Sequence, residues 1–460
     1  MRYISKYSWV RYRYEFGERS RSLFREPWAG GVVLVLCVII ALLLANLEST
    51  REWYHAILTA DLSFNITSHN GLNITFPEDL SVEKFINDGL MVIFFFGVGL
   101  EIKREVMTGQ LSSFRRAILP VIAALGGMII PALIYTIFNN GTPTAGGWGI
   151  PTATDIAFAI GIMSILGDKV PLSLKIFLTA LAIADDLGAI IVIAVFYGGA
   201  INWGCLIAAF VIMIILYFMN RLGESRLLYY LFPAIVVWSL FYYSGIHATL
   251  AGVLMAILVP TKPRYSKLSL LRQSERIEAN IVEATKIEDD ELYQEKLVEL
   301  GHLSYGSVSM SHALESILAP YITFVILPIF ALANAGVVIN LDDLNIFAVD
   351  LHGGSIGMGI FFGLMLGKPL GIFIASWAAI KLKLAEMPED SSWRMIFAVA
   401  CLGGIGFTMS IFVDTLAFGS VSEMFVDQGK IAILFGSLAS VLLGVLLINI
   451  FAKRNNKQSL

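Results

Sequence analysis

The chain has 460 residues, of which 57% are hydrophobic and only 15% are charged, and its formal net charge is −4 at pH 7. Its mean hydropathy is +0.75. These values exclude an ordinary soluble protein and predict a polytopic membrane protein, with no nucleic-acid partner. Because the three cysteines are odd in number and lie in apolar runs (Cys37, Cys205 and Cys401), we expect no disulfide framework.

Twelve apolar runs are long enough to be expected as transmembrane helices. They lie near residues 29–47, 85–106, 115–138, 149–166, 174–197, 203–220, 227–243, 245–259, 316–338, 355–380, 393–417 and 429–451. The stretch before them has no apolar core and no cleavage site of a signal peptide. We therefore expect a tail over residues 1–28, a transmembrane domain over 29–451 and a second tail over 452–460.

The positive charges predict the orientation of these runs. Of the 32 Lys and Arg residues, 28 lie in the two tails and in every second loop; the others are Arg51, Lys84, Lys368 and Lys430. Loops rich in Lys and Arg face the cytoplasm. We therefore expect both termini of this multi-pass protein to be cytoplasmic.

Two loops carry a pattern of their own. Residues 62–76 alternate β-favouring side chains around Asn70-Gly71, which predicts an external β-hairpin. Asn65 and Asn73 match the glycosylation pattern, but Ile and Thr are expected in strands in any case. The loop over residues 261–312 is basic first and acidic later, which indicates a solvated cytoplasmic loop with some amphipathic helix; a regulatory surface is the alternative.

The adjacent acids Asp185 and Asp186 lie within the apolar run from Lys175 to Tyr197. At 1.5 Å per residue, Asp185 is roughly 15 Å from Lys175, near the centre of a hydrocarbon core about 30 Å thick. A charged acid there costs at least roughly 2.5 kcal/mol to place. The pair is therefore expected to be an ion or proton site.

Two runs are poor continuous helices. Pro151 removes a backbone donor shortly before Asp155, and Thr152 and Thr154 can cap the helical piece that follows. The eleventh run contains three glycines at mid-membrane depth, which permit an unwound backbone (Gly403, Gly404 and Gly406). Interrupted spans in corresponding positions of the two halves are typical of secondary transporters built from inverted repeats.

Lys368 is the one cation inside an apolar run, and it opposes three acids. The carbonyl ends of interrupted helices carry partial negative charge that a lysine offsets, whereas the N–H ends favour a carboxylate such as Asp155. Asp185 and Asp186 then remain to exchange a cation for protons. A hard cation such as Na⁺ takes oxygen ligands, and a carboxyl group cannot hold the cation and its proton together.

Five motifs resemble those of the NhaA-type bacterial sodium/proton antiporters over about residues 27–451. They are Ala153-Thr-Asp-Ile-Ala-Phe-Ala159, Lys175-Ile-Phe-Leu-Thr-Ala-Leu-Ala-Ile-Ala-Asp-Asp-Leu-Gly-Ala189, Ser244-Gly-Ile-His-Ala-Thr-Leu-Ala-Gly252, Leu366-Gly-Lys-Pro-Leu-Gly371 and Gly404-Ile-Gly-Phe-Thr-Met-Ser-Ile-Phe412. This family is itself one of the known examples of inverted repeats with interrupted helices.

The resemblance implies an all-α fold of twelve spans with spans 4 and 11 interrupted, a homodimer, and export of Na⁺ or Li⁺ driven by entering protons, without a cofactor. It implies that Asp185 and Asp186 carry the ions and that Asp155 and Lys368 compensate the half-helix dipoles. We expect the hairpin to hold the dimer, because exposed strand edges recruit partners. It also implies a pH response at residues near the cytoplasmic end (Glu101, Glu105, His247 and Glu315).

Some features depart from the family pattern. The loop over residues 261–312 and the N-terminal tail are long, and Asp414 follows the eleventh-run break where a small residue is expected. Asp88 is interpreted as structural.

Two other classes of membrane protein also place acidic residues within their spans or use interrupted helices. An intramembrane aspartyl protease needs a Gly-x-Gly-Asp motif, which is absent, and has no use for Lys368. A sodium-coupled symporter would need a polar pocket beside the ion site, for which the chain offers few further midplane polar groups.

Overall fold

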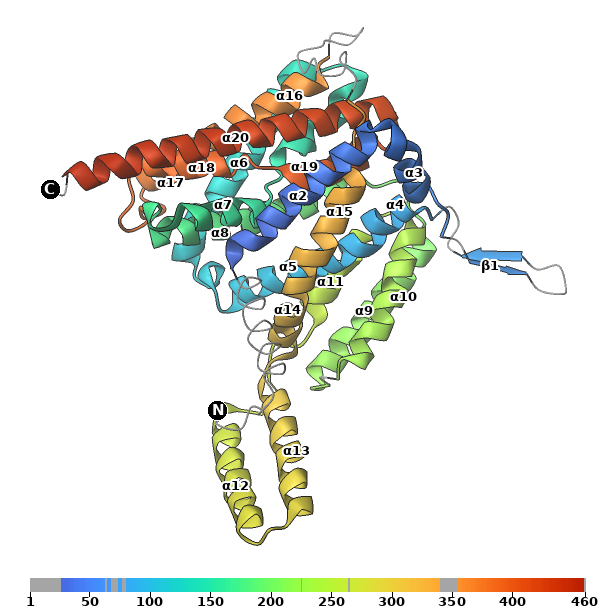
Figure 1. The fold of residues 1–460 in the computed structure, drawn as a ribbon, viewed down its shortest axis with the longest axis vertical. Coiled ribbons are helices and arrows are strands. Elements are labelled where there is room, and N and C mark those ends of the chain that lie inside the picture. Colours follow the sequence, from blue (N-terminus) through green and yellow to red (C-terminus); the bar gives the residue numbers. More distant parts are fainter. Residues whose placement is uncertain are drawn as a thin grey trace. The chain divides into compact units, whose positions relative to one another are not determined.

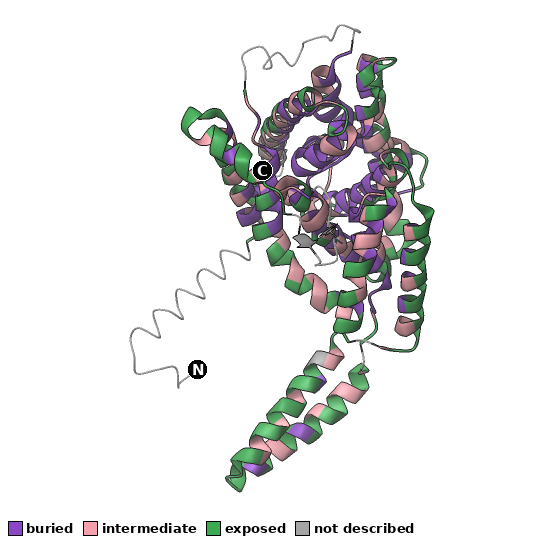
Figure 2. Cartoon of the chain, turned by 90° about the vertical axis from the view of Figure 1, so that its right-hand side faces the viewer, coloured by how far each residue is buried: buried purple, intermediate pink, exposed green. Residues whose placement is uncertain are grey.

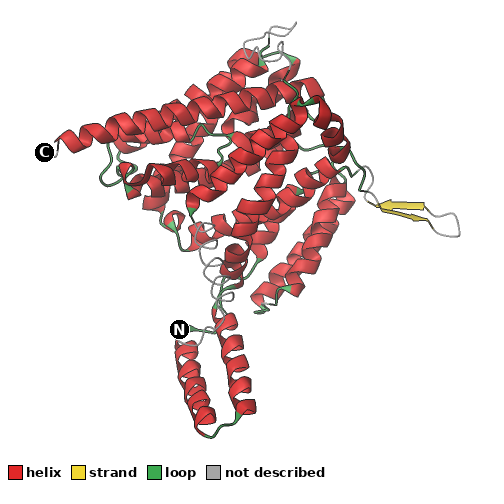
Figure 3. Ribbon diagram, in the orientation of Figure 1, coloured by secondary structure: helices red, strands yellow, loops and turns green. Residues whose placement is uncertain are grey.

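The structure is a computed structural model that describes residues 26–62, 64–67, 73–76, 80–224, 226–263, 265–339 and 354–458. The described chain is helical apart from two short strands (Figures 1 and 3). Its contacts divide it into two units. The first comprises Met1–Phe94, Glu105–Gly198 and Pro320–Leu460, and the second comprises Phe95–Arg104 and Gly199–Ala319.

Within the described residues, nine helices are long and apolar enough to cross a membrane: Trp28–Asn46, Val82–Met107, Phe114–Asn139, Pro143–Lys169, Leu172–Phe196, Trp203–Arg221, Met310–Asn334, Ile356–Lys381 and Glu423–Ala452. A tenth candidate is the pair Trp393–Leu402 and Phe407–Phe418, bent by 52°. Two shorter apolar helices, Leu228–Ser244 and Thr249–Leu258, lie where the seventh and eighth runs were predicted. The prediction of a helical, multi-pass membrane protein is confirmed.

The first unit is built from consecutive helices whose apolar side chains pack on one another. Its N-terminal elements are α2 (Pro27–Asn46), α3 (Glu48–Leu58), β1 (Phe64–Thr67), β2 (Asn73–Phe76), α4 (Val82–Lys84), the π-helical turn η1 (Phe85–Leu90) and the start of α5 (Met91–Met107). The central elements are η2 (Gln110–Ser112), α6 (Phe114–Asn139), the 3₁₀ helix η3 (Pro143–Thr152), α7 (Ile156–Leu166), η4 (Gly167–Lys169) and α8 (Leu172–Phe196).

The C-terminal part of the first unit begins inside α14 (Met310–Tyr321). It continues with the π-helical turn η5 (Ile322–Ile326), α15 (Leu327–Asn334), α16 (Ile356–Phe362), the π-helical turn η6 (Gly363–Gly367), α17 (Lys368–Lys381), α18 (Trp393–Leu402), α19 (Phe407–Phe418) and α20 (Glu423–Gln458). Helix α17 packs along α6, and α20 packs against α16, α18 and α19. These contacts bring the predicted site residues of the two sequence halves into one unit.

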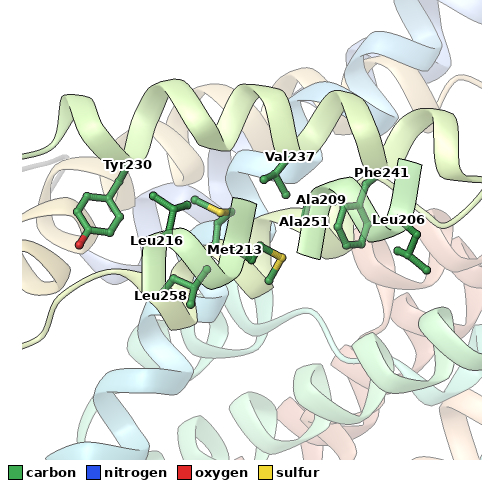
Figure 4. Packing of buried hydrophobic residues seen from close by; sticks show 10 residues of the cluster. Leu206, Ala209, Met213, Leu216, Tyr230, Val237, Phe241, Ala251 and Leu258 are labelled. Atoms are coloured by element: carbon green, nitrogen blue, oxygen red, sulfur yellow. The ribbon is translucent and has the colours of Figure 1, made fainter. Parts of the chain in front are cut away.

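The second unit contains the middle of α5 together with α9 (Trp203–Arg221), α10 (Leu228–Ser244), α11 (Thr249–Leu258), α12 (Lys267–Lys286), α13 (Asp290–Ser307) and most of α14. Helices α9, α10 and α11 share an apolar cluster that includes Met213, Val237 and Phe241 (Figure 4). The ammonium of Lys103 donates to the backbone carbonyl of Ile257 at 2.6 Å and also to that of Val259. Lys103 therefore caps the carbonyl end of α11.

The cytoplasmic loop predicted over residues 261–312 consists mainly of the two helices α12 and α13, which pack on each other. Most of their surface is exposed, and Ile277 and Ala284 are among their few buried side chains (Figure 2). Helix α12 has an apolar face and is amphipathic, whereas the apolar residues of α13 are spread around the helix.

Helix α3 was not predicted from the sequence. Tyr54 fastens it to the rest of the first unit, because its hydroxyl donates to the carbonyl of Leu332 at 2.6 Å. Burial, with a smaller contribution from the negative charge of Glu83, raises the pKa of Tyr54 to about 12. The phenol therefore stays protonated and remains a donor over the physiological pH range.

Strands β1 and β2 lie within the predicted hairpin and pair antiparallel, with Phe64 opposite Phe76 and Thr67 opposite Asn73. The predicted turn at Asn70-Gly71 lies outside the described residues, as does most of the predicted N-terminal tail. The chain between Leu62 and Leu80 is here called the arm. Its two ends are joined by hydrogen bonds from Leu62 N–H to the Leu80 carbonyl at 2.8 Å and from Val82 N–H to the Ala60 carbonyl at 3.0 Å.

Candidate ion-binding site

The backbone leaves the helical conformation at two places, here called breaks, and the two breaks contact each other. Residues 153–155 separate η3 from α7, and residues 403–406 separate α18 from α19. The backbone N–H of Asp155 donates to the carbonyl of Ile405 at 2.6 Å, and the hydroxyl of Ser410 donates to the carbonyl of Ile150 at 2.8 Å. Backbone groups that the breaks release from helical pairing are therefore satisfied by the opposite segment.

Asp155 lies at the N-terminal ends of two helices at once. Its carboxylate accepts a hydrogen bond from Phe158 N–H at 3.0 Å, which makes it the N-cap of α7. It also accepts from Thr408 N–H at 3.1 Å and from the Thr408 hydroxyl, in the first turn of α19. Its side chain is only 2% exposed. A carboxylate in this position is stabilised by the positive ends of both helix dipoles.

The expectation that Thr152 and Thr154 cap the helical piece after Pro151 is wrong. The hydroxyl of Thr152 donates to the carbonyl of Gly149 at 2.7 Å, and that of Thr154 donates to the carbonyl of Gly403 at 2.8 Å. Asp155 takes the cap because it directly precedes α7 in extended conformation. The threonines instead satisfy carbonyl groups at the two breaks.

Lys368 is fully buried at the start of α17, directly after the π-helical turn η6. Its ammonium donates to Asp185 Oδ2 and, at 2.7 Å, to Thr154 Oγ1. Because the hydroxyl of Thr154 donates a hydrogen bond to the carbonyl of Gly403, a chain of polar contacts links the lysine to the C-terminal end of α18. The lysine thus contacts an acid directly and a helix carbonyl end through one hydroxyl.

Asp185 and Asp186 lie side by side in the sequence of α8, and each is 1% exposed. Asp186 interacts electrostatically with Lys368. Asp185 Oδ1 has no hydrogen-bond partner among the described residues, so the carboxylate that contacts Lys368 retains an unused acceptor. No group of three or more His, Cys, Asp or Glu side chains suited to a metal ion occurs in the described part of the chain. A cation at this pair would therefore take its other ligands from hydroxyl, carbonyl or water oxygens.

The three glycines of the second break lie where the backbone closely approaches neighbouring groups. A Cβ atom on Gly404 would lie 2.4 Å from the carbonyl oxygen of Leu364, and one on Gly406 would lie 2.0 Å from Ser410 Oγ. Gly403 provides the carbonyl that Thr154 contacts. Glycine at position 404 lets the backbone of the break approach η6, the turn that precedes Lys368.

The four residues expected to take part in the pH response are distributed over both units. Glu101 and Glu315 belong to the second unit, where Arg104 forms an ion pair with Glu315 and lies 3.7 Å from a Glu101 oxygen. His247 also belongs to this unit and lies between α10 and α11. Glu105 belongs to the first unit, where its carboxylate accepts from Gln110 N–H at 2.8 Å.

Three polar residues of the first unit were missed from the sequence. Thr408 donates to Asp155, and Asn87 and Asn334 exchange amide hydrogen bonds of 3.1 and 2.8 Å next to Asp88. A signal for Thr408 was available: a hydroxyl side chain two residues after the last glycine of a break lies in the first helical turn. No comparable pattern marks the two asparagines.

Comparison with known proteins assigns the chain to a family. The family described as Na⁺/H⁺ antiporter 1 matches residues 21–448. The Na⁺/H⁺ antiporter NhaA 2 of Flavobacterium johnsoniae is 42% identical over 95% of this chain and 93% of its own length. The chain belongs to the Na⁺/H⁺ antiporter 1 family. The antiporter is also 40% identical to an Escherichia coli Na⁺/H⁺ antiporter NhaA, over 92% of this chain and 95% of that protein.

A solved structure of the sodium proton antiporter MjNhaP1 from Methanocaldococcus jannaschii aligns with 91% of this antiporter at 12% identity and a TM-score of 0.42. The assignment rests on the sequence matches and not on this alignment. The predicted family is thereby confirmed, and it is a family of transporters, not of enzymes.

Proposed function

We propose that the antiporter exports Na⁺ or Li⁺ in exchange for protons by alternating access, with cation and protons competing for Asp185 and Asp186. The observation that carries this proposal is the buried contact of Lys368 with Asp185, which leaves Asp185 Oδ1 without a hydrogen-bond partner in the described chain. A hard cation takes oxygen ligands of this kind. A bound proton would occupy the same oxygen atoms, so the two ligands exclude each other.

Asp155 and Lys368 are proposed to compensate the charges of the broken helices. Asp155 accepts from backbone N–H groups of α7 and α19, where a negative charge is favoured. Lys368 reaches the carbonyl end of α18 through Thr154. With the helix charges compensated in this way, Asp185 and Asp186 can bind either a cation or protons.

We propose twelve spans arranged as inverted repeats, with spans 4 and 11 interrupted. The nine long helices, the bent pair counted as one span and the two shorter apolar helices together make twelve. The distribution of Lys and Arg supports cytoplasmic termini. The similarity to bacterial Na⁺/H⁺ antiporters supports a bacterial inner-membrane location and a role in sodium and pH homeostasis.

We propose that the antiporter is a homodimer held through residues 62–76. Strands β1 and β2 form a sheet of two strands within the described chain, and such a sheet has two unpaired edges. A second copy offers a matching edge. The closed base between Leu62 and Leu80 allows the arm to be shortened without opening the rest of the unit.

We propose a pH response centred on Arg104, whose ion pair with Glu315 joins α5 to α14 within the second unit and which also lies near Glu101, one turn away on α5. Loss of the negative charge of Glu315 would weaken this junction, and Glu101 competes with Glu315 for the same arginine. Glu105 and His247 are proposed to contribute from their own positions.

Flux in vesicles that contain only the purified protein tests the exchange. With Na⁺ and H⁺ as the only permeant solutes besides buffer, addition of Na⁺ is expected to dissipate a preformed ΔpH, and Li⁺ is expected to replace Na⁺. K⁺ serves as the control cation and should have no effect. A ΔpH that persists until an organic solute is added would instead identify a symporter.

A further inference from the structure

Asp414 is a buried acid that the proposed ion site does not use. It lies in the second half of α19, and its side chain is 0% exposed. Neither carboxylate oxygen has a hydrogen-bond partner among the described residues. A buried carboxylate without donors is strongly disfavoured in its charged form. The group therefore requires a ligand or a partner to remain where it is.

The two charged side chains that interact with Asp414 both belong to α20, and one phenol comes from a different segment. Lys430 and Asp427 of α20 both interact with it electrostatically, and the phenol of Tyr197, just after α8, does so as well. Of the other elements in contact with α19, η3, α7 and α15 contain no titratable residue. Asp155, in the break before α7, contacts Thr408 in the first turn of α19. Lys430 is therefore the positive charge available to the ionised carboxylate.

Gly429 sets the position of the carboxyl group. A Cβ atom at Gly429 would lie 2.0 Å from Asp414 Oδ1, so the carboxyl group rests directly on the backbone of α20. The next residue along that helix is Lys430, which is 7% exposed. The acid and the lysine are thus held at the same helix contact without a hydrogen bond between them.

A proton fits this site better than a metal cation. A hard cation needs several oxygen ligands. Asp185 and Asp186 offer two adjacent carboxyl groups, whereas Asp414 offers a single one, whose Oδ1 rests against the backbone of α20 at Gly429. A proton removes the charge of the carboxyl group and needs no further ligand.

We propose that Asp414 is a second proton-binding site, separate from Asp185 and Asp186, and that it forms an ion pair with Lys430 when it releases its proton. The proton leaves one carboxylate oxygen for solvent, and the ammonium then donates to the ionised group. This pair draws α19 against α20. Because Thr408 of α19 donates to Asp155, the site links a second protonation event to the break beside the ion site. The link to exchange rests on the proposed function.

Infrared spectroscopy of the purified full-length protein tests the site directly. In a titration from acid to alkaline pH, the wild type is expected to show a carbonyl band of a protonated carboxyl group that does not respond to Na⁺. Asp414→Asn should lack this band. Glu423→Gln is the matched control, because Glu423 is an exposed acid in the first turn of α20, and it should keep the band.

Two further variants keep Asp414 and change only its surroundings, so a misfolded protein or a loss of exchange cannot be mistaken for loss of the carboxyl group. Lys430→Gln should keep the band to higher pH, because the ionised carboxylate has lost its counter-charge. Gly429→Ala should shift the band, because the new methyl group displaces the carboxyl group. Asp414→Asn should still exchange Na⁺ for H⁺, with a displaced pH profile.

Identical carboxyl bands and pH profiles in wild type and Asp414→Asn would overturn the proposal. Failure of the proposed ion site is a different result, in which Na⁺ leaves every band of the wild type unchanged. The carboxyl band that disappears in Asp414→Asn is measured in the same titration, whether or not the other bands respond to Na⁺.

Discussion

The ammonium of Lys368 lies 2.7 Å from the hydroxyl oxygen of Thr154, the residue immediately before the cap of α7. This contact ties the lysine on α17 to the break before α7, and the same hydroxyl reaches the carbonyl of Gly403 in the other break. One side chain therefore joins three segments of the site. Removal of the Thr154 hydroxyl should therefore lower both the stability of the protein and its affinity for the ion.

Thr154→Val removes this hydroxyl and keeps the shape of the side chain. We expect it to destabilise the protein by about 1–3 kcal/mol, since a buried ammonium and a buried carbonyl each lose a partner. Thr154→Ser keeps the hydroxyl and should stay close to wild type. A thermal melt in detergent, with the apparent KM for Na⁺, measures both effects. Equal melting of the Val and Ser variants would show that the hydroxyl is not needed.

Lys368→Ala should be less stable than Lys368→Arg, and both should displace the pH profile of transport. Loss of one partner of a buried ion pair costs roughly 3–5 kcal/mol. Arginine keeps the charge but has a bulkier, planar head group, so it should preserve folding better than exchange. Thermal melts and Na⁺-driven fluorescence dequenching over a pH series measure these quantities. A Lys368→Ala variant that melts like wild type and keeps its pH midpoint would exclude charge compensation by this lysine.

Gly404→Ala should destabilise the break, because its Cβ atom would lie 2.4 Å from the backbone carbonyl of Leu364. Overpacking of this kind typically costs about 1–3 kcal/mol. Gly146→Ala in η3 is the matched control, since nothing lies within 4 Å of its Cβ position. The two variants are compared by thermal melting. A control that melts lower than Gly404→Ala would contradict the close approach.

The twelve apolar runs, the buried acids and the breaks could be located from sequence because each depends on local composition. Asp155 also caps its own helix, which is a local property. The contact of Asp155 with Thr408 could not be predicted, because 253 positions separate the two residues and only the crossing of the breaks unites them. Helix α3 was missed because Glu48, Arg51 and Glu52 interrupt its apolar pattern.

Shortening of residues 63–79 to a brief Gly-Ser linker should yield monomers and leave transport intact. The hydrogen bond of 2.8 Å between Leu62 and Leu80 closes the base without the arm, so the first unit should keep its fold. Size-exclusion chromatography with light scattering gives the mass of the detergent-solubilised protein. The proposed dimer contact would be disproved by a dimer of undiminished strength.

Competition between proton and cation predicts the pH dependence of Na⁺ affinity. As the pH falls below the range in which the acids release their protons, the apparent KM for Na⁺ should rise. The expected rise is about tenfold per pH unit for each competing proton. The maximal rate at saturating Na⁺ should change much less. Initial rates at a series of pH values and Na⁺ concentrations give both quantities. A KM independent of pH would mean that the two ions do not share a site.

The most direct measurement compares the wild type with Asp186→Asn in proteoliposomes that contain only Na⁺, H⁺ and buffer. Asparagine keeps the shape of the side chain but cannot bind and release a proton, so competition for the site is lost. The account predicts that Na⁺ dissipates a preformed ΔpH with the wild type and leaves it intact with Asp186→Asn, although both proteins are folded and inserted. Dissipation of the ΔpH by Asp186→Asn at the wild-type rate would contradict exchange at the two aspartates.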